Sequence, residues 1–136
     1  MERPTPIDEQ YTFLDGVVIS ETDLKGIITF SNRKFCEISG YTKSELLGEN
    51  HSILRHPDIP KAVYKDLWDT IQKGEIWTGT IKNIRKDGRY YWVYSHISPV
   101  RKGDKIVGYI AARKQASPME IEEAEEAYEK SIQEEN

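Results

Sequence analysis

The sequence lacks long apolar stretches and contains a single cysteine. Nowhere do about 18 consecutive apolar residues occur, as a membrane-spanning helix requires. The first ten residues, MERPTPIDEQ, contain no apolar run typical of a signal peptide. The lone Cys36 cannot form an internal disulfide, which favours a reducing compartment. We therefore expect a soluble cytoplasmic protein that does not insert directly into a membrane.

A stripe of basic residues is also missing. The net charge is −4, and residues 117–136 hold eight glutamates and one lysine. The preceding 116 residues are therefore nearly neutral, with 18 basic and 15 acidic side chains. A protein that follows a phosphate backbone needs clustered lysine and arginine, so we do not expect nucleic acid as a partner. A chain of 136 residues suits one domain with one core.

No known catalytic or metal-binding pattern stands out. The sequence shows no serine or cysteine nucleophile in a known context, no glycine-rich phosphate loop and no paired-carboxylate motif. One cysteine and three scattered histidines make no recognised zinc set. We therefore predict neither an enzyme nor a metal site, although a catalytic triad assembles in space and need not show in sequence.

Two hairpin signals and a change of period predict the strands. Residues 16–20 and 27–30 are rich in β-branched side chains and flank the turn residues 23–26. Alternation with a period of two then runs through 76–86, 89–101 and 105–114, separated by Asp87-Gly88 and Gly103-Asp104. These five runs predict one antiparallel sheet.

Capping signals predict the helices. Asn32 can cap a short helix that ends at Gly40, and Thr42 with Glu45 forms a capping box for another. The longest internal helix spans 62–71 and stops before Gly74. The expected fold class is therefore α+β: a five-stranded antiparallel sheet with short helices covering one face and a C-terminal helix.

The C-terminal helix begins with Ser117-Pro118-Met119-Glu120, which combines an N-cap, a proline and a capping-box glutamate. Its apolar stripe consists of Ile121, Ala124, Tyr128 and Ile132. Two interpretations remain open. The segment is either an acidic solvated helix with a weak stripe, or a connector that docks on a partner or an output domain.

Three short segments are distinctive: GIITFSN at 26–32, SGY at 39–41 and YWV at 91–93. They resemble recurring segments of the PAS family, and the resemblance covers about residues 12–116. With RHPDIPK at 55–61, GEIWTG at 74–79 and KN at 82–83, the chain is similar to the N-terminal PAS domain of bacterial aerotaxis receptors. This resemblance implies the PAS fold, with 1–11 as an N-terminal segment, 12–116 as the sensor and 117–136 as an acidic connector.

The same resemblance implies non-covalent FAD binding and the sensing of cellular redox state. The implied partner is a chemoreceptor signalling domain or another signal-transduction protein, and PAS homodimers are a further mode of association. Haem is the rival ligand, with His51, His56 or His96 as an axial ligand, and a ligand-free interaction module is the second alternative.

The segment 54–60, LRHPDIP, provides the first site candidates. Arg55 offers a fork of donors suited to phosphate or ribityl oxygens, and His56 can donate or accept a hydrogen bond. Pro57 and Pro60 bias the residues before them away from helical angles and so form an irregular corner. Asp58 either caps the next helix or contacts the ligand.

A strand face provides the next candidates. Trp77 and Asn83 share one face by the two-residue period, and an Asn83 carboxamide facing a flavin ring would have both its donor and acceptor satisfied. Trp77 and Trp68 either stack on a ligand or fill the core, and Asn32 either contacts the ligand or caps its helix. The predicted cofactor-binding residues are Arg55, His56, Asp58, Asn83, Trp77, Asn32, Trp68 and His51.

His51 also separates the chain from the light-sensing flavin branch of the family. That branch has a Gly-x-Asn-Cys-Arg-type segment whose cysteine attacks the flavin. The similar place here reads Gly48-Glu49-Asn50-His51, with histidine in place of the thiol. We therefore do not expect a photochemical thiol adduct.

Overall fold

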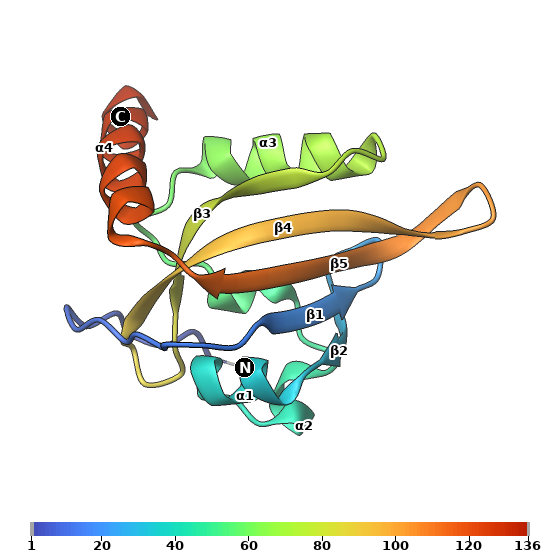
Figure 1. The fold of residues 1–136 in the computed structure, drawn as a ribbon, viewed down its shortest axis with the longest axis horizontal. Helices are drawn as coiled ribbons and strands as arrows, with labels where there is room; N and C mark the ends of the chain where they lie inside the picture. Colours follow the sequence, from blue (N-terminus) through green and yellow to red (C-terminus); the bar gives the residue numbers. More distant parts are fainter. Residues whose placement is uncertain (1, 136) are drawn as a thin grey trace.

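The computed structural model describes residues 2–135. Its strands are β1 (Val18–Thr22), β2 (Ile28–Ser31), β3 (Trp77–Ile84), β4 (Tyr90–Lys102) and β5 (Lys105–Gln115). They form one antiparallel sheet in the order β2-β1-β5-β4-β3 (Figure 1). The five-stranded antiparallel sheet is thus confirmed, and β3, β4 and β5 begin and end within two residues of the predicted bounds.

The helices are α1 (Arg33–Ser39), α2 (Lys43–Leu46), the 3₁₀ helix η1 (His51–Leu54), α3 (Lys61–Gln72) and α4 (Pro118–Glu135). Helices α1, α2, α3 and α4 match the four helices that the sequence predicts. The short η1 is not predicted, because a single 3₁₀ turn leaves no apolar periodicity in the sequence. It begins after Asn50, whose side-chain oxygen accepts a hydrogen bond from the Ser52 backbone N–H.

The hydrophobic core lies between one face of the sheet and the helices from α1 to α3. Alternate positions of the strands provide its sheet side, including Val18, Ile81, Val93 and Ala111. Helical side chains pack against these residues: Phe35, Ile38, Leu46, Leu54, Leu67 and Ile71. Short helices therefore cover one sheet face, as the sequence predicts.

The predicted caps are confirmed, except at α3. Asn32 caps α1, and both capping boxes form, at α2 and at α4. Helix α3 begins after Pro60, which has no side-chain cap, and Asp58 does not take this role. Instead, a carboxylate oxygen of Glu135, at the end of α4, accepts a hydrogen bond from the Ala62 backbone N–H at 3.1 Å.

Helix α4 packs against its own domain (Figure 1). Its stripe contributes the buried Ala124 and the half-buried Tyr128, whose hydroxyl donates to the Thr80 carbonyl oxygen of β3 at 2.6 Å. The stripe is therefore a docking face for the sheet edge. Within residues 2–135, no helix is long and apolar enough to cross a bilayer.

Candidate ligand-binding site

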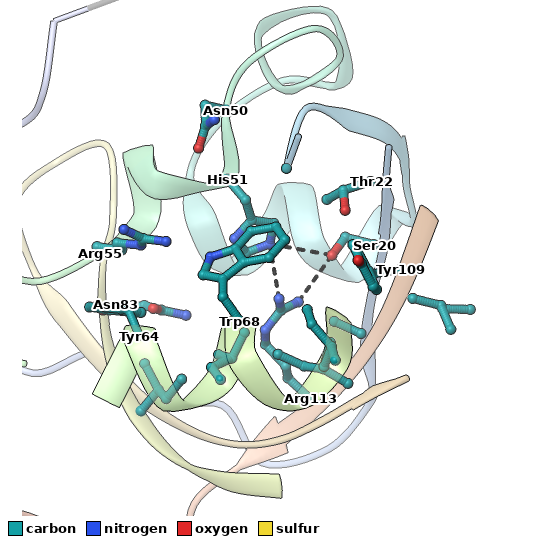
Figure 2. Close-up of a pocket in the computed structure, with 17 residues that line it drawn as sticks. Ser20, Thr22, Asn50, His51, Arg55, Tyr64, Trp68, Asn83, Tyr109 and Arg113 are labelled. Atoms are coloured by element: carbon teal, nitrogen blue, oxygen red, sulfur yellow. Dashed lines mark hydrogen bonds between the residues drawn. The ribbon is translucent and has the colours of Figure 1, made fainter. Parts of the chain in front are cut away.

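A cleft lies between the inner face of the sheet and the helical segments η1 and α3 (Figure 2). Its empty volume is about 670 Å³, including the part open to solvent. Its apolar walls come from Leu67, Ile71, Ile81, Ile97 and Ala111. A flat apolar ligand would therefore find walls on the helical side and on the sheet side.

Two aromatic rings fix one end of the cleft. Trp68 of α3 meets Tyr109 of β5 edge to face, with ring centroids 5.5 Å apart. Gly26 lies beside them with φ +86°, and a Cβ at that position would come within 3.2 Å of the Trp68 ring. A side chain at residue 26 would therefore be strained and would press on Trp68.

Three polar side chains meet on the sheet side of the cleft. Arg113 of β5 donates hydrogen bonds to Ser20 Oγ at 3.1 Å and to His51 Nε2 at 2.9 Å (Figure 2). Because a guanidinium only donates, His51 accepts at Nε2 and carries its proton on Nδ1. Burial and the positive charges of Arg113 and Arg55 lower the pKa of His51 well below its usual value, so His51 is neutral at pH 7.

The opposite wall of the cleft carries Arg55 and Tyr64. The Arg55 guanidinium lies 4.1 Å from the centre of the Tyr64 ring, in a cation–π contact. The Tyr64 hydroxyl is buried and has no hydrogen-bond partner among the described residues 2–135. Burial therefore raises the pKa of Tyr64, so its O–H stays protonated at neutral pH.

Asn83 of β3 also faces the cleft, with 5% of its surface exposed. Its backbone pairs with Arg55 in an isolated bridge, so the segment after η1 is joined to the edge of the sheet. Across the strands, Asn83 lies opposite Tyr91. Burial raises the pKa of Tyr91, while Arg113, Arg85 and a hydrogen bond with Asn83 oppose that rise.

Comparisons with known proteins agree on the family. The protein-family model described as "PAS fold" matches residues 28–112, which is more than half of the chain. The aerotaxis receptor of Escherichia coli is 45% identical over 114 residues, covering 84% of this chain and 22% of the receptor. This chain belongs to the PAS family.

Other matches extend to further sensors. The nitrogen fixation regulatory protein of Klebsiella pneumoniae is 35% identical, covering 62% of this PAS domain and 17% of that protein. The dark structure of the blue-light photoreceptor Aureochrome1 LOV superposes with a TM-score of 0.73 at 22% identity, covering 85% and 86% of the two chains, which shows the fold alone. The chain spans about a fifth of the length of these two curated relatives.

Four of the eight predicted cofactor residues line the cleft of this PAS domain. These are Arg55, Asn83, Trp68 and His51. The structure brings them together from β3, from α3 and from η1 with the residue after it, although 32 positions separate His51 from Asn83 in the sequence. Their contact with a cofactor stays a prediction.

The other four lie outside the cleft lining. The buried His56 accepts a hydrogen bond at Nδ1 from the Asp58 backbone N–H at 3.0 Å, and the exposed Asp58 pairs with Lys82 at 2.7 Å. Trp77 shares the inner face with Asn83 as predicted, but its Nε1 donates to Asp66 of α3 at 3.0 Å. Asn32 accepts from the Phe35 and Ile19 backbone N–H groups and donates to the Val17 carbonyl.

Sequence reasoning missed Arg113, Ser20 and Tyr64 as site residues. The available signal was the strand period: in the predicted strand 105–114, Arg113 is two residues from Ala111 and therefore shares its face. A charged side chain on an inward face is unusual enough to mark a site. The sequence could not show that Ser20 and His51 converge on it.

The cleft fits a flavin. An isoalloxazine ring is flat and mostly apolar, with hydrogen-bonding groups along one edge. The cleft offers apolar walls together with a guanidinium, a carboxamide and the unpartnered hydroxyl of Tyr64. Cys36 is not among the residues that line the cleft. Among residues 2–135, no three potential metal-binding side chains of His, Cys, Asp or Glu gather in one place.

Proposed function

We propose that this PAS domain binds FAD non-covalently in the cleft and converts the redox state of the flavin into a signal for a chemotaxis partner. The observation that carries the proposal is the apolar-walled cleft with three convergent polar groups: the Arg113 guanidinium, the Asn83 carboxamide and the unpartnered Tyr64 hydroxyl. The 45% identity to the aerotaxis receptor supports the same ligand and output.

Arg55, Asn83, Trp68 and His51 would hold the ring system from different sides. Arg55 lies at one wall of the cleft, next to the corner that contains His56 and Asp58, and its donor fork suits phosphate oxygens. This corner supports FAD, whose second phosphate and adenosine need room beyond the ring.

When bound, the flavin supplies electron transfer coupled to proton uptake at a ring nitrogen, which turns a hydrogen-bond acceptor into a donor. Asn83 can respond because its carboxamide presents either C=O or NH₂ to the same partner. If one carboxamide orientation leaves a buried group without its hydrogen bond, the loss costs about 1–3 kcal/mol. That is enough to shift a balanced equilibrium between two conformations of the domain.

The exit route for the signal is β3. Asn83 and Thr80 lie on this edge strand, and the Thr80 carbonyl accepts the hydroxyl of Tyr128 from α4. A change at Asn83 therefore reaches α4 through residues 80–83 of one strand. In this proposal residues 12–116 form a cytoplasmic sensor without catalytic activity, and α4 is the connector to a chemoreceptor signalling domain or to a second copy of the domain.

A haem site has less support from the geometry. The Nε2 lone pair of His51 is already engaged by Arg113, and Nδ1 of His56 accepts from the Asp58 backbone. His96 is exposed on β4, away from the cleft. No histidine of the cleft therefore offers a free nitrogen lone pair in this arrangement.

The deciding experiment is the absorption spectrum of the purified protein, followed by chromatography of the cofactor that heating releases. We expect the paired near-ultraviolet and blue bands of a flavin, and FAD as the released compound. FMN as the released compound would contradict the choice of FAD. A Soret band or the lack of any visible band would overturn the proposal and favour a haem sensor or a ligand-free interaction module.

A further inference from the structure

Arg113 is a buried cation without an anion. Its exposed surface is 6%, and its hydrogen bonds go to a hydroxyl and a neutral imidazole. No carboxylate among residues 2–135 lies within 4.0 Å of its guanidinium nitrogens. A guanidinium has five N–H donors, and burying its charge without a counter-charge is strongly unfavourable. A buried charge that is this unfavourable for folding suggests a role in binding a ligand.

Arg85 shows how the same chain treats another buried arginine. Arg85 is 9% exposed, pairs with the Asp87 carboxylate at 3.1 Å, and donates to the backbone carbonyls of Glu37 and Ile38. It lies outside the cleft, whereas Arg113 lines it. The buried arginine that holds the fold together is paired, and the one that faces the cleft is not.

The groups around Arg113 cannot supply the missing negative charge at neutral pH. His51 of η1 is neutral, and Ser20 of β1 does not titrate. Burial raises the pKa of the Tyr91 phenol of β4, so this group also stays neutral. Burial lowers the pKa of Arg113 to about 10, which leaves it charged at pH 7. Arg55, the other cation near His51, adds positive charge. The cleft therefore favours a ligand that carries, or acquires, negative charge.

We propose that Arg113, held in place by Ser20 and His51, binds the edge of the flavin ring that becomes negatively charged on reduction. This inference rests on the proposed function and adds the charge of the reduced state. Arg113 supplies the positive charge that a second proton would otherwise supply. Reduction by an external donor then transfers two electrons and one proton to the neutral ring, which ends with a charge of −1.

The test is the midpoint potential of the flavin-loaded protein as a function of pH, with dithionite as the reductant. If reduction takes up one proton per two electrons, the midpoint potential falls by about 30 mV for each pH unit. If it takes up two protons, the midpoint potential falls by about 59 mV for each pH unit. Between about pH 6 and about pH 8 we expect the smaller slope for the wild type and for Arg113→Lys, and the larger slope for Arg113→Met. The larger slope in the wild type, or the smaller one in Arg113→Met, overturns the inference.

A second measurement separates a ligand role from a folding role. In the ligand-free protein we expect Arg113→Met to melt at the same temperature as the wild type or higher, because Ser20 and His51, 3.3 Å apart, can bond to each other. The control Arg85→Met should melt lower. A fall for Arg113→Met as large as that of the control makes Arg113 a structural residue and overturns the inference.

The two proposals fail in different ways. A wild-type protein without flavin overturns both. A wild-type protein with flavin whose pH slope does not respond to Arg113→Met leaves the proposed function intact and overturns only the role of Arg113.

Discussion

Tyr128 of α4 donates its hydroxyl proton to the Thr80 carbonyl of β3, the edge strand whose Asn83 faces the cleft. The hydrogen bond is 2.6 Å long and joins residues 48 positions apart. It is a direct link between the strand that lines the candidate site and helix α4. Four predictions follow from this link and from the contacts described above.

Tyr128→Phe removes the link and keeps the ring. We expect α4 to lose about 0.5–1.5 kcal/mol of docking free energy, the usual net value of one hydrogen bond. Hydrogen exchange of the α4 amides should accelerate accordingly, while flavin retention stays unchanged. Tyr41→Phe, between α1 and α2 and far from α4 in the fold (Figure 1), is the matched control. Unchanged exchange in α4 would show that the hydroxyl does not hold the helix.

Asn83→Ala removes the carboxamide from the cleft. Loss of its hydrogen bonds to a buried ligand costs about 1–3 kcal/mol, so we expect flavin to bind roughly 5 to 150 times more weakly. Titration of the ligand-free protein with FAD gives the affinity. The control is Thr78→Ala, which changes an exposed residue on the opposite face of the same strand. Equal FAD affinity for Asn83→Ala and the wild type would remove Asn83 from the site.

Tyr64→Phe removes a buried hydroxyl that has no partner. We expect the ligand-free protein to become more stable by about 1 kcal/mol, because the cost of leaving the hydroxyl unpaired disappears. The flavin-bound form should lose affinity, because the ligand loses a donor. Chemical denaturation with and without FAD measures both effects. A less stable ligand-free variant would indicate that the hydroxyl already has a partner within the protein.

Asp87 predicts a pH dependence of stability. Burial alone raises its pKa, but hydrogen bonds from Arg89 and Arg85 outweigh burial and lower the pKa to about 2. A pKa below the ordinary 3.8 means that the contribution is complete above about pH 4 and is lost as the pH falls toward 2. Asp87 is 42% exposed, so solvent screening leaves about 1 kcal/mol.

The corresponding variant is Asp87→Asn. We expect its free energy of unfolding to lie about 1 kcal/mol below that of the wild type at pH 7, with the gap closing as the pH approaches 2. Denaturation series at several pH values check this. Asp69→Asn, at an exposed ion pair on α3, is the control with a smaller expected gap. If the difference in free energy of unfolding between Asp87→Asn and the wild type does not change with pH, the effect comes from hydrogen bonding and not from the charge of Asp87.

Local patterns were enough to predict the sheet and most of the helices. Alternation, turn residues and capping boxes act over three to ten neighbouring residues, and these predict β3, β4, β5, α2 and the start of α4. Asn32 shows the limit of this reasoning. Its capping bond with Phe35 is local, but its other two side-chain hydrogen bonds join Ile19 and Val17, 13 and 15 residues away.

The candidate site was only half predicted, because it depends on how distant segments meet. Trp77 shares the strand face of Asn83, yet that face is longer than the cleft, and Trp77 reaches Asp66 of α3 instead. Asp58 could not be excluded as a cap until Glu135, 77 residues later in the sequence, was found near the same helix end. Arg113 is recognised as a site residue only through its hydrogen bonds to Ser20 and His51, which lie 93 and 62 residues away in the sequence.

Helix α4 is attached to both walls of the cleft. Near its middle, Tyr128 is bonded to β3, and at its end Glu135 is bonded to the first turn of α3. Helix α3 and strand β3 cannot move apart without stretching one of these two bonds or tilting the helix. In the proposed function, the orientation of α4 would therefore follow the width of the cleft, and we expect a ligand that changes this width by a fraction of an ångström to tilt the helix.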